Sequence, residues 1–133
     1  LLLSDGYKRT YSSYVDDIPT QIRLMNVEEL SQYDTIVFCG GNASVLLNEV
    51  NRTGFSKPLK QAIENGLVYL GISAGSMIAA GNFADGLGYL TNPLIPHVEI
   101  GNPCGEITNN DSIKLSDGQI VWIQGEKNIR KSP

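Results

Sequence analysis

The sequence predicts an α/β domain with a mostly parallel sheet, flanked by helices and ending in a C-terminal β-hairpin. The parallel part is indicated by two apolar, β-rich runs, Thr35–Cys39 and Leu67–Leu70, each of which is expected to be a buried strand and leads through glycine into a helix-like segment. The hairpin is indicated by Asp117-Gly118, which separates two runs of alternating polarity. Strands that alternate with helices are typical of one layered domain, which we expect to span residues 1–133.

Further elements are predicted along the chain from local signals. Asn26 is expected to cap a short helix, because Glu28 and Glu29 occupy the first turn that follows it. Gly66 is a favourable residue for leaving the helix before it. The remaining predicted strands are Leu1–Leu3, Gln21–Met25, Leu94–Val98, Ser112–Leu115 and Gln119–Ile123, and the remaining predicted helices are Ala43–Val50, Pro58–Asn65 and one that opens at Ser76.

Composition and charge exclude several classes of function. The 133 residues suffice for one domain with a hydrophobic core, and the net charge of −4 comes without any basic run, so nucleic acid is not an expected partner. No apolar segment approaches the roughly 20 residues that cross a membrane, so no membrane association is expected. Cys39 ends a predicted strand and is expected to be a buried thiol. Without a signal peptide or paired cysteines, we expect a cytoplasmic, reducing location.

A lone serine stands at a tight junction between a predicted strand and a predicted helix. It is Ser73, in the stretch Gly71-Ile72-Ser73-Ala74-Gly75. Ligands collect at the carboxyl ends of strands in α/β sheets, and a sharp strand-to-helix turn exposes the residue at its corner. Small neighbours avoid clashes in such a turn, so the pattern predicts a nucleophilic serine. The alternative is that the small residues only let a helix pack closely on a strand.

A second glycine turn supports the same interpretation. Gly40 and Gly41 also follow a predicted strand, so they would lie beside Ser73 if the two strands are neighbours. Their backbone N–H groups, together with that of Ala74, would then form an oxyanion hole. The alternative is a loop that binds a phosphate or simply turns, although neither a dinucleotide-binding motif nor a P-loop is present.

A nucleophilic serine needs a base and an orienting acid. His97 is the only histidine, and it ends a strand-like run. Asp85 is the only acid between Ser73 and His97 and is our candidate, although Asp85-Gly86 is also a strong turn former. Glu99 would share a strand face with His97, and the acid can also belong to a segment that this chain lacks. No metal-binding motif is present, so we expect neither a metal nor a cofactor.

Several motifs together resemble peptidase family S51, which includes peptidase E, an aspartyl dipeptidase, and cyanophycinase. They are CGGN after one strand, GISAGS after the next, and DGLG followed by IPH. The resemblance implies a Ser-His-acid hydrolase on a flavodoxin-like sheet, related to class I glutamine amidotransferases. It makes Ser73 the nucleophile, His97 the base and Gly40–Asn42 the glycine turn, with Asn42 as a candidate substrate contact. Members of the family are longer, and the stretch from Ser73 to His97 is short by comparison.

The function that this resemblance implies is a serine-type peptidase that hydrolyses small peptides, N-terminal aspartyl dipeptides among them. The alternatives are a cyanophycinase-like or amidotransferase-like hydrolase and a catalytically inactive binding module on the same fold. A glutaminase of that kind normally has cysteine where this chain has Ser73. An α/β-hydrolase esterase would fit the order Ser73, Asp85, His97 but usually needs a longer chain. The expected partner is a small peptide, and a homodimer is a possible assembly.

Overall fold

The computed structural model describes residues 26–124 and 128–132. Contacts within the chain divide it into two compact units, of which the first ends at Ile78 and the second begins at Ala79, and each is described by itself. The predicted strands Leu1–Leu3 and Gln21–Met25 lie outside the described residues. The single domain spanning residues 1–133 stays a prediction.

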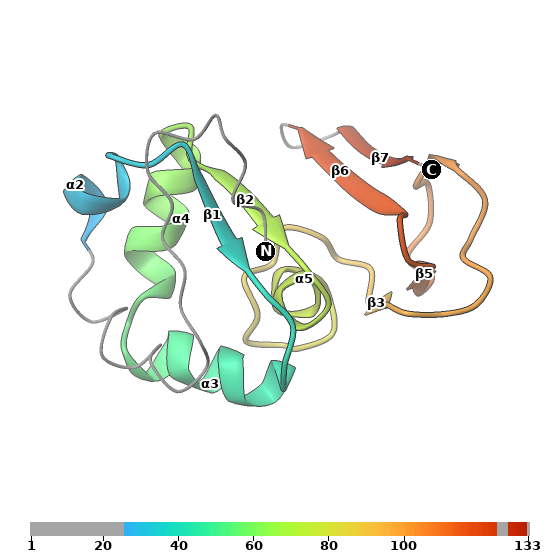
Figure 1. The fold of residues 1–133 in the computed structure, drawn as a ribbon, viewed down its shortest axis with the longest axis horizontal. Helices are drawn as coiled ribbons and strands as arrows, with labels where there is room; N and C mark the ends of the chain where they lie inside the picture. The colour runs from blue at the N-terminus through green and yellow to red at the C-terminus, as the bar shows by residue number, and fades with distance from the viewer. Residues whose placement is uncertain (1–25, 125–127, 133) are drawn as a thin grey trace. The chain divides into compact units, whose positions relative to one another are not determined.

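The first unit alternates helices with parallel strands, as an α/β arrangement requires (Figure 1). β1 and β2 are parallel neighbours, in a register that pairs Thr35 with Val68 and Phe38 with Gly71. Both strands therefore end at the same edge. No helix in the described part of the chain is both long and apolar enough to span a membrane. The elements of this unit are α2 (Val27–Leu30), β1 (Thr35–Phe38), α3 (Ala43–Arg52), α4 (Ser56–Glu64), β2 (Val68–Gly71) and α5 (Ala74–Ala79), the last of which ends in the second unit.

Polar caps determine where two of these helices begin. The side chain of Asn26 accepts a hydrogen bond from the N–H of Glu29 (2.9 Å), which confirms the predicted cap of α2. Asn42 caps α3 in the same way by accepting from the N–H of Val45 (3.1 Å). Gly66, with a φ of 109°, adopts a conformation that favours glycine just after α4. The starts of α2 and α3 thus follow from local side-chain chemistry.

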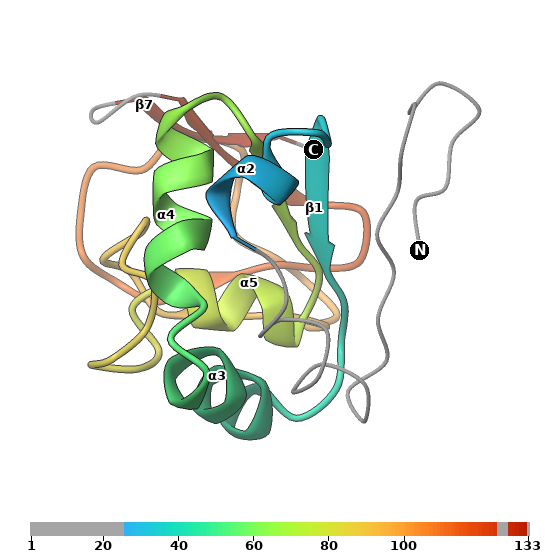
Figure 2. The same cartoon turned by 90° about the vertical axis from the view of Figure 1, so that its left-hand side faces the viewer.

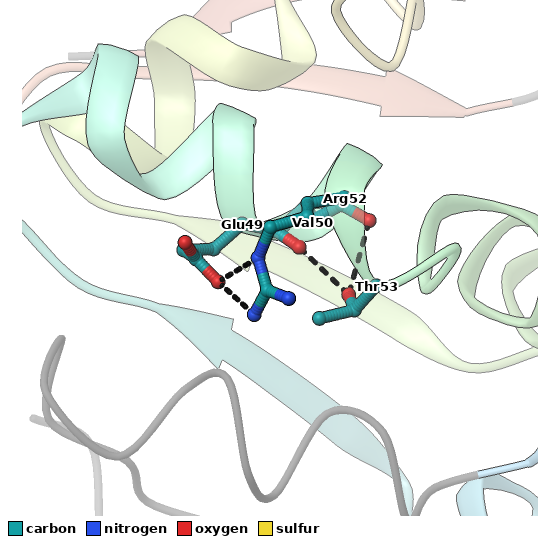
Figure 3. Close-up of polar contacts among 4 residues, drawn as sticks. All are labelled: Glu49, Val50, Arg52 and Thr53. Carbon is teal, nitrogen blue, oxygen red and sulfur yellow. Dashed lines mark hydrogen bonds and ion pairs between the residues drawn. The ribbon is translucent and has the colours of Figure 1, made fainter.

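The C-terminal end of α3 carries a small polar cluster (Figure 3). Arg52 donates from Nε (3.0 Å) and Nη2 (2.6 Å) to one carboxylate oxygen of Glu49. The hydroxyl of Thr53 lies within hydrogen-bond distance of the carbonyl oxygens of Glu49 (2.7 Å) and Val50 (3.3 Å). These two oxygens also accept from the backbone N–H groups of Thr53 and Phe55 (3.0 Å each). The guanidinium of Arg52 is therefore engaged on its own helix.

Burial in the first unit differs between its two strands. β1 alternates, with Ile36 and Phe38 buried, whereas Val68 at the start of β2 is 58% exposed. The prediction of a buried strand from Leu67 to Leu70 was therefore wrong for β2. A strand is buried on both faces only when a layer covers each face, and the exposure of Val68 shows that its side of β2 is not covered at this position. Cys39 is half-buried rather than buried, because it continues the alternation of β1 on the same face as the half-buried Thr35 and Val37.

Helices supply most of the remaining core of this unit. α2 packs against α4, as Figure 2 shows. The amphipathic helices α3 and α4 each direct apolar side chains inward. The buried apolar residues contributed by α2, α3, α4 and the turn between the last two are Leu30, Leu46, Leu47, Val50, Phe55, Leu59 and Ala62.

The second unit is built from short strands. β3 and β5 form a parallel pair, while β7 is the central strand of an antiparallel sheet with β4 and β6 at its edges. The strands are β3 (Leu94–Ile95), β4 (Gly105–Glu106), β5 (Ile113–Lys114), β6 (Ile120–Gln124) and β7 (Asn128–Ser132). The core of the unit consists of the buried residues Ala80, Leu90, Leu94, Ile113 and Leu115.

β6 and β7 are paired antiparallel, but they are not the two strands of the predicted hairpin. The prediction paired Ser112–Leu115 with Gln119–Ile123, whereas β5 pairs with β3 and β6 pairs with β7. The predicted turn is present, since Gly118 has a φ of 91° between the two segments. The pairing of β5 with β3 places Ile113 opposite Leu94, and both side chains are buried in the core of this unit.

Gly75, in the first turn of α5, lies so close to β1 that a Cβ there would overlap the carbonyl oxygen of Phe38. We therefore expect Gly75→Ala to lower the free energy of unfolding by about 1–3 kcal/mol, as overpacking does elsewhere. Gly40→Ala is the matched control, because its Cβ would meet that of Ser73 at an ordinary 3.5 Å. Urea unfolding measures both variants. Equal midpoints for the two would contradict the close approach of α5 to β1.

Candidate active site

Ser73 occupies the corner between β2 and α5. Its φ of 55° lies in the left-handed region, which costs a residue other than glycine about 1–2 kcal/mol. The N–H of Ile72 donates to the carbonyl oxygen of Phe38 (2.9 Å), and the N–H of Gly75 donates to that of Ile72 (3.0 Å). The chain therefore passes from strand to helix within three residues, and β1 anchors the turn.

Two glycines make this corner sterically possible. A Cβ on Gly71 would lie 2.7 Å from backbone atoms of Gly75 and Ser76, and a Cβ on Gly75 would overlap Phe38. The hydroxyl of Ser76 donates to the carbonyl oxygen of Gly71 (2.7 Å), which ties the first turn of α5 back to the end of β2. The prediction that the neighbours of Ser73 are small for steric reasons is confirmed for Gly71 and Gly75.

The glycine turn that follows β1 lies beside the serine. A Cβ placed on Gly40 would be 3.5 Å from Cβ and 3.9 Å from Oγ of Ser73, so the expected proximity is confirmed for Gly40. Gly41 has a φ of 141°, which favours glycine. Outside the helices and strands, no backbone carbonyl oxygen of the described residues accepts a hydrogen bond from the N–H of Gly40, Gly41 or Ala74. The carboxamide oxygen of Asn42 is used to cap α3.

In the second unit, His97 lies two residues beyond β3 and has a φ of 61°. Its Nδ1 lies 2.7 Å from Oδ1 of Asp117. The parallel register explains this meeting: Ile95 lies opposite Lys114, and its carbonyl oxygen accepts from the N–H of Leu115 (3.0 Å). Residues just past the carboxyl ends of β3 and β5 are therefore brought together. The two side chains are 61% and 84% exposed, so water reaches the pair.

Asp85, the acid chosen from the sequence, lies exposed in a turn. The N–H of Gly86 donates to the carbonyl oxygen of Phe83 (3.2 Å), as expected for an Asp-Gly turn. Its role as the triad acid stays a prediction. Sequence reasoning assigned Asp117 only to a hairpin turn. Its proximity to His97 depends on the β3–β5 pairing, and two-residue strands leave little trace of their partners in the sequence.

The structure brings Gly40 and Ser73 together in the first unit, and His97 and Asp117 in the second. Ser73 and His97 belong to different units. They share one property: in the described part of the chain, they are the only residues other than glycine with a positive φ. Over the same residues, no group of three or more His, Cys, Asp or Glu side chains could hold a metal ion.

Comparison with known proteins identifies a family. Residues 15–130 match the model described as peptidase family S51. The uncharacterized peptidase Lmo0363 of Listeria monocytogenes serovar 1/2a is 32% identical over 141 aligned residues, which cover 86% of this chain and 68% of that protein. The uncharacterized peptidase PM1590 of Pasteurella multocida is 38% identical over 66 residues, which cover 50% of this chain and 32% of that protein.

A solved structure shows the same fold. It is the crystal structure of a Listeria monocytogenes EGD-e protein that was proposed to be a peptidase E, with a TM-score of 0.62 at 23% identity. The match covers 91% of this chain and 66% of that one. The chain thus spans between 32 and 68% of the length of the three proteins compared.

The left-handed backbone of Ser73 can be tested without any substrate. Ser73→Ala and Ser73→Gly both remove the hydroxyl, but only alanine keeps a Cβ in the strained conformation. We expect the glycine variant to be the more stable of the two by about 1 kcal/mol, because glycine adopts positive φ without steric cost. Thermal and urea unfolding of the two proteins measure the difference. An alanine variant as stable as the glycine variant would argue against the strained corner.

Proposed function

The chain belongs to peptidase family S51, and we propose that it acts on small peptides as a serine-type peptidase, with Ser73 as nucleophile and His97 as general base. The observation that carries this proposal is the left-handed backbone shared by these two residues and, among the described residues, by no other residue except glycines. Strained conformations of this kind cluster at functional sites, where the surrounding structure imposes them. The proposal requires Ser73 and His97 to meet in the active protein.

In the proposed reaction, Oγ of Ser73 attacks the carbonyl carbon of the scissile peptide bond, and its proton passes to Nε2 of His97. The carbonyl oxygen becomes an oxyanion, for which the N–H groups of Gly40, Gly41 and Ala74 are the proposed donors. His97 then gives the proton to the leaving amine as the carbon–nitrogen bond breaks. Water, activated by the same imidazole, hydrolyses the acyl-enzyme and restores the serine.

N-terminal aspartyl dipeptides are the proposed substrates. This choice of substrate is supported by the motif resemblance and by the peptidase E-like fold. An aspartyl side chain calls for a cationic partner, yet no Arg or Lys occurs between Gly66 and Gly101, and Arg52 is already paired with Glu49. The cation would therefore come from another part of the protein. Asn42 remains a candidate substrate contact through its amide nitrogen, since its oxygen caps α3.

We expect Ser73→Ala to abolish peptide hydrolysis and labelling by a fluorophosphonate probe while the fold is retained, because removal of a nucleophilic serine typically lowers kcat by about 10⁶. Ser76→Ala is the matched control: it removes a half-buried hydroxyl of the same corner and one hydrogen bond to Gly71, a net loss of about 0.5–1.5 kcal/mol. This control should still be labelled. Persistent labelling or turnover in Ser73→Ala would refute the proposed nucleophile.

A substrate panel separates the hydrolases that share this scaffold. We expect turnover of aspartyl dipeptides to exceed that of the matched asparaginyl dipeptides, which have nearly the same shape but no charge. A poly-aspartate-arginine polymer and free glutamine complete the panel, and liquid chromatography quantifies the products. Preferential cleavage of the polymer or of glutamine would replace the dipeptidase assignment with a cyanophycinase-like or amidotransferase-like one. A protein inert to the whole panel and to the probe would be a binding module.

A further inference from the structure

We propose that Asp117 is a positioning residue that holds the imidazole of His97 in the tautomer required of a general base. This inference rests on the proposed function, in which His97 accepts the proton of Ser73. It is carried by the contact of 2.7 Å between Nδ1 of His97 and Oδ1 of Asp117. The contact makes Asp117 the orienting acid, although Asp117 lies outside the segment between Ser73 and His97.

The chemistry of this contact determines where the imidazole proton lies. An ionised carboxylate can only accept hydrogen bonds, so the ring atom that faces it must be the donor. In the neutral ring the proton therefore lies on Nδ1, and Nε2 keeps the lone pair that can accept the proton of a serine. When Nε2 has taken that proton, the carboxylate faces an imidazolium and stabilises its charge.

The backbone holds both partners in place. His97 is constrained by its left-handed conformation, two residues after β3. Asp117 is the second residue of a turn in which the N–H of Gln119 donates to the carbonyl oxygen of Ser116 (3.0 Å). The side chain of Gln119 accepts from the N–H of Ser116 (3.1 Å) and donates to the carbonyl oxygen of Asn102 (3.0 Å). The turn that carries Asp117 is thus hydrogen-bonded, through Gln119, to Asn102 in the same unit.

Asp111 provides a matched control. Like Asp117, it is an exposed aspartate of the second unit, and it lies in a bend two residues before β5. Asp→Asn at either position keeps the size of the side chain and a residue that turns accept. The two variants therefore differ in which carboxylate is removed rather than in their expected effect on folding, which far-UV circular dichroism checks.

The first readout needs no activity. Because the chain has one histidine, the ¹⁵N resonances of the imidazole report on His97 alone. At a pH where the ring is neutral, we expect the Nδ1–H tautomer to dominate in the wild-type protein and in Asp111→Asn. In Asp117→Asn its population should fall, because the side-chain amide can also donate and no longer demands a donor on Nδ1. An unchanged tautomer in Asp117→Asn would overturn the proposal.

The second readout is kinetic. Loss of a buried orienting carboxylate costs about 10⁴ in kcat. Because water reaches this pair, we expect a measurable loss in kcat that is smaller than about 10⁴-fold, with KM changed by less than about twofold. The rate of fluorophosphonate labelling should fall in parallel. A shifted tautomer with wild-type kcat would overturn the positioning role. A wild-type protein that does not react with the probe would refute the proposed function. In that case the tautomer population of His97 would still show whether Asp117 orients the imidazole.

Discussion

The corner that carries Ser73 depends on the close approach of α5 to the carbonyl group of Phe38. Only glycine fits at residue 75 at this separation. Residue 71 must also lack a side chain, because backbone atoms of the first turn of α5 lie where its Cβ would be. With both ends of the corner fixed, the residue between them takes a left-handed backbone. The parallel register of β1 and β2 then places Gly40 beside the serine.

The same construction occurs twice along the chain. Ser73 lies two residues after β2, and His97 lies two residues after β3, each at the carboxyl end of a parallel pair and each with a φ near +60°. Each also has a chemically useful neighbour from the partner strand's end, namely Gly40 in the first unit and Asp117 in the second. Each half of the proposed machinery is therefore organised locally, by pairing within its own unit.

Sequence reasoning succeeded where the signal is local. Asn26 could be predicted as a cap because the oxygen and the N–H that it serves lie three residues apart. The serine corner could be predicted because its glycines are contiguous with the strand. The partner of β5 and the exposure of Val68 could not be predicted, because both depend on which segments distant in sequence lie alongside. Asp117 was missed for the same reason: its turn is local, whereas its neighbour His97 is not.

The left-handed conformations of Ser73 and His97 have a consequence for protein engineering. Each costs about 1–2 kcal/mol, which is a sizeable share of the roughly 5–15 kcal/mol that holds a domain folded. A screen that rewards heat resistance alone would favour glycine at either position, since glycine relieves the cost. It would thereby erase the two side chains on which the proposed chemistry depends. Stabilising this scaffold by consensus or directed evolution therefore calls for a functional selection applied in parallel.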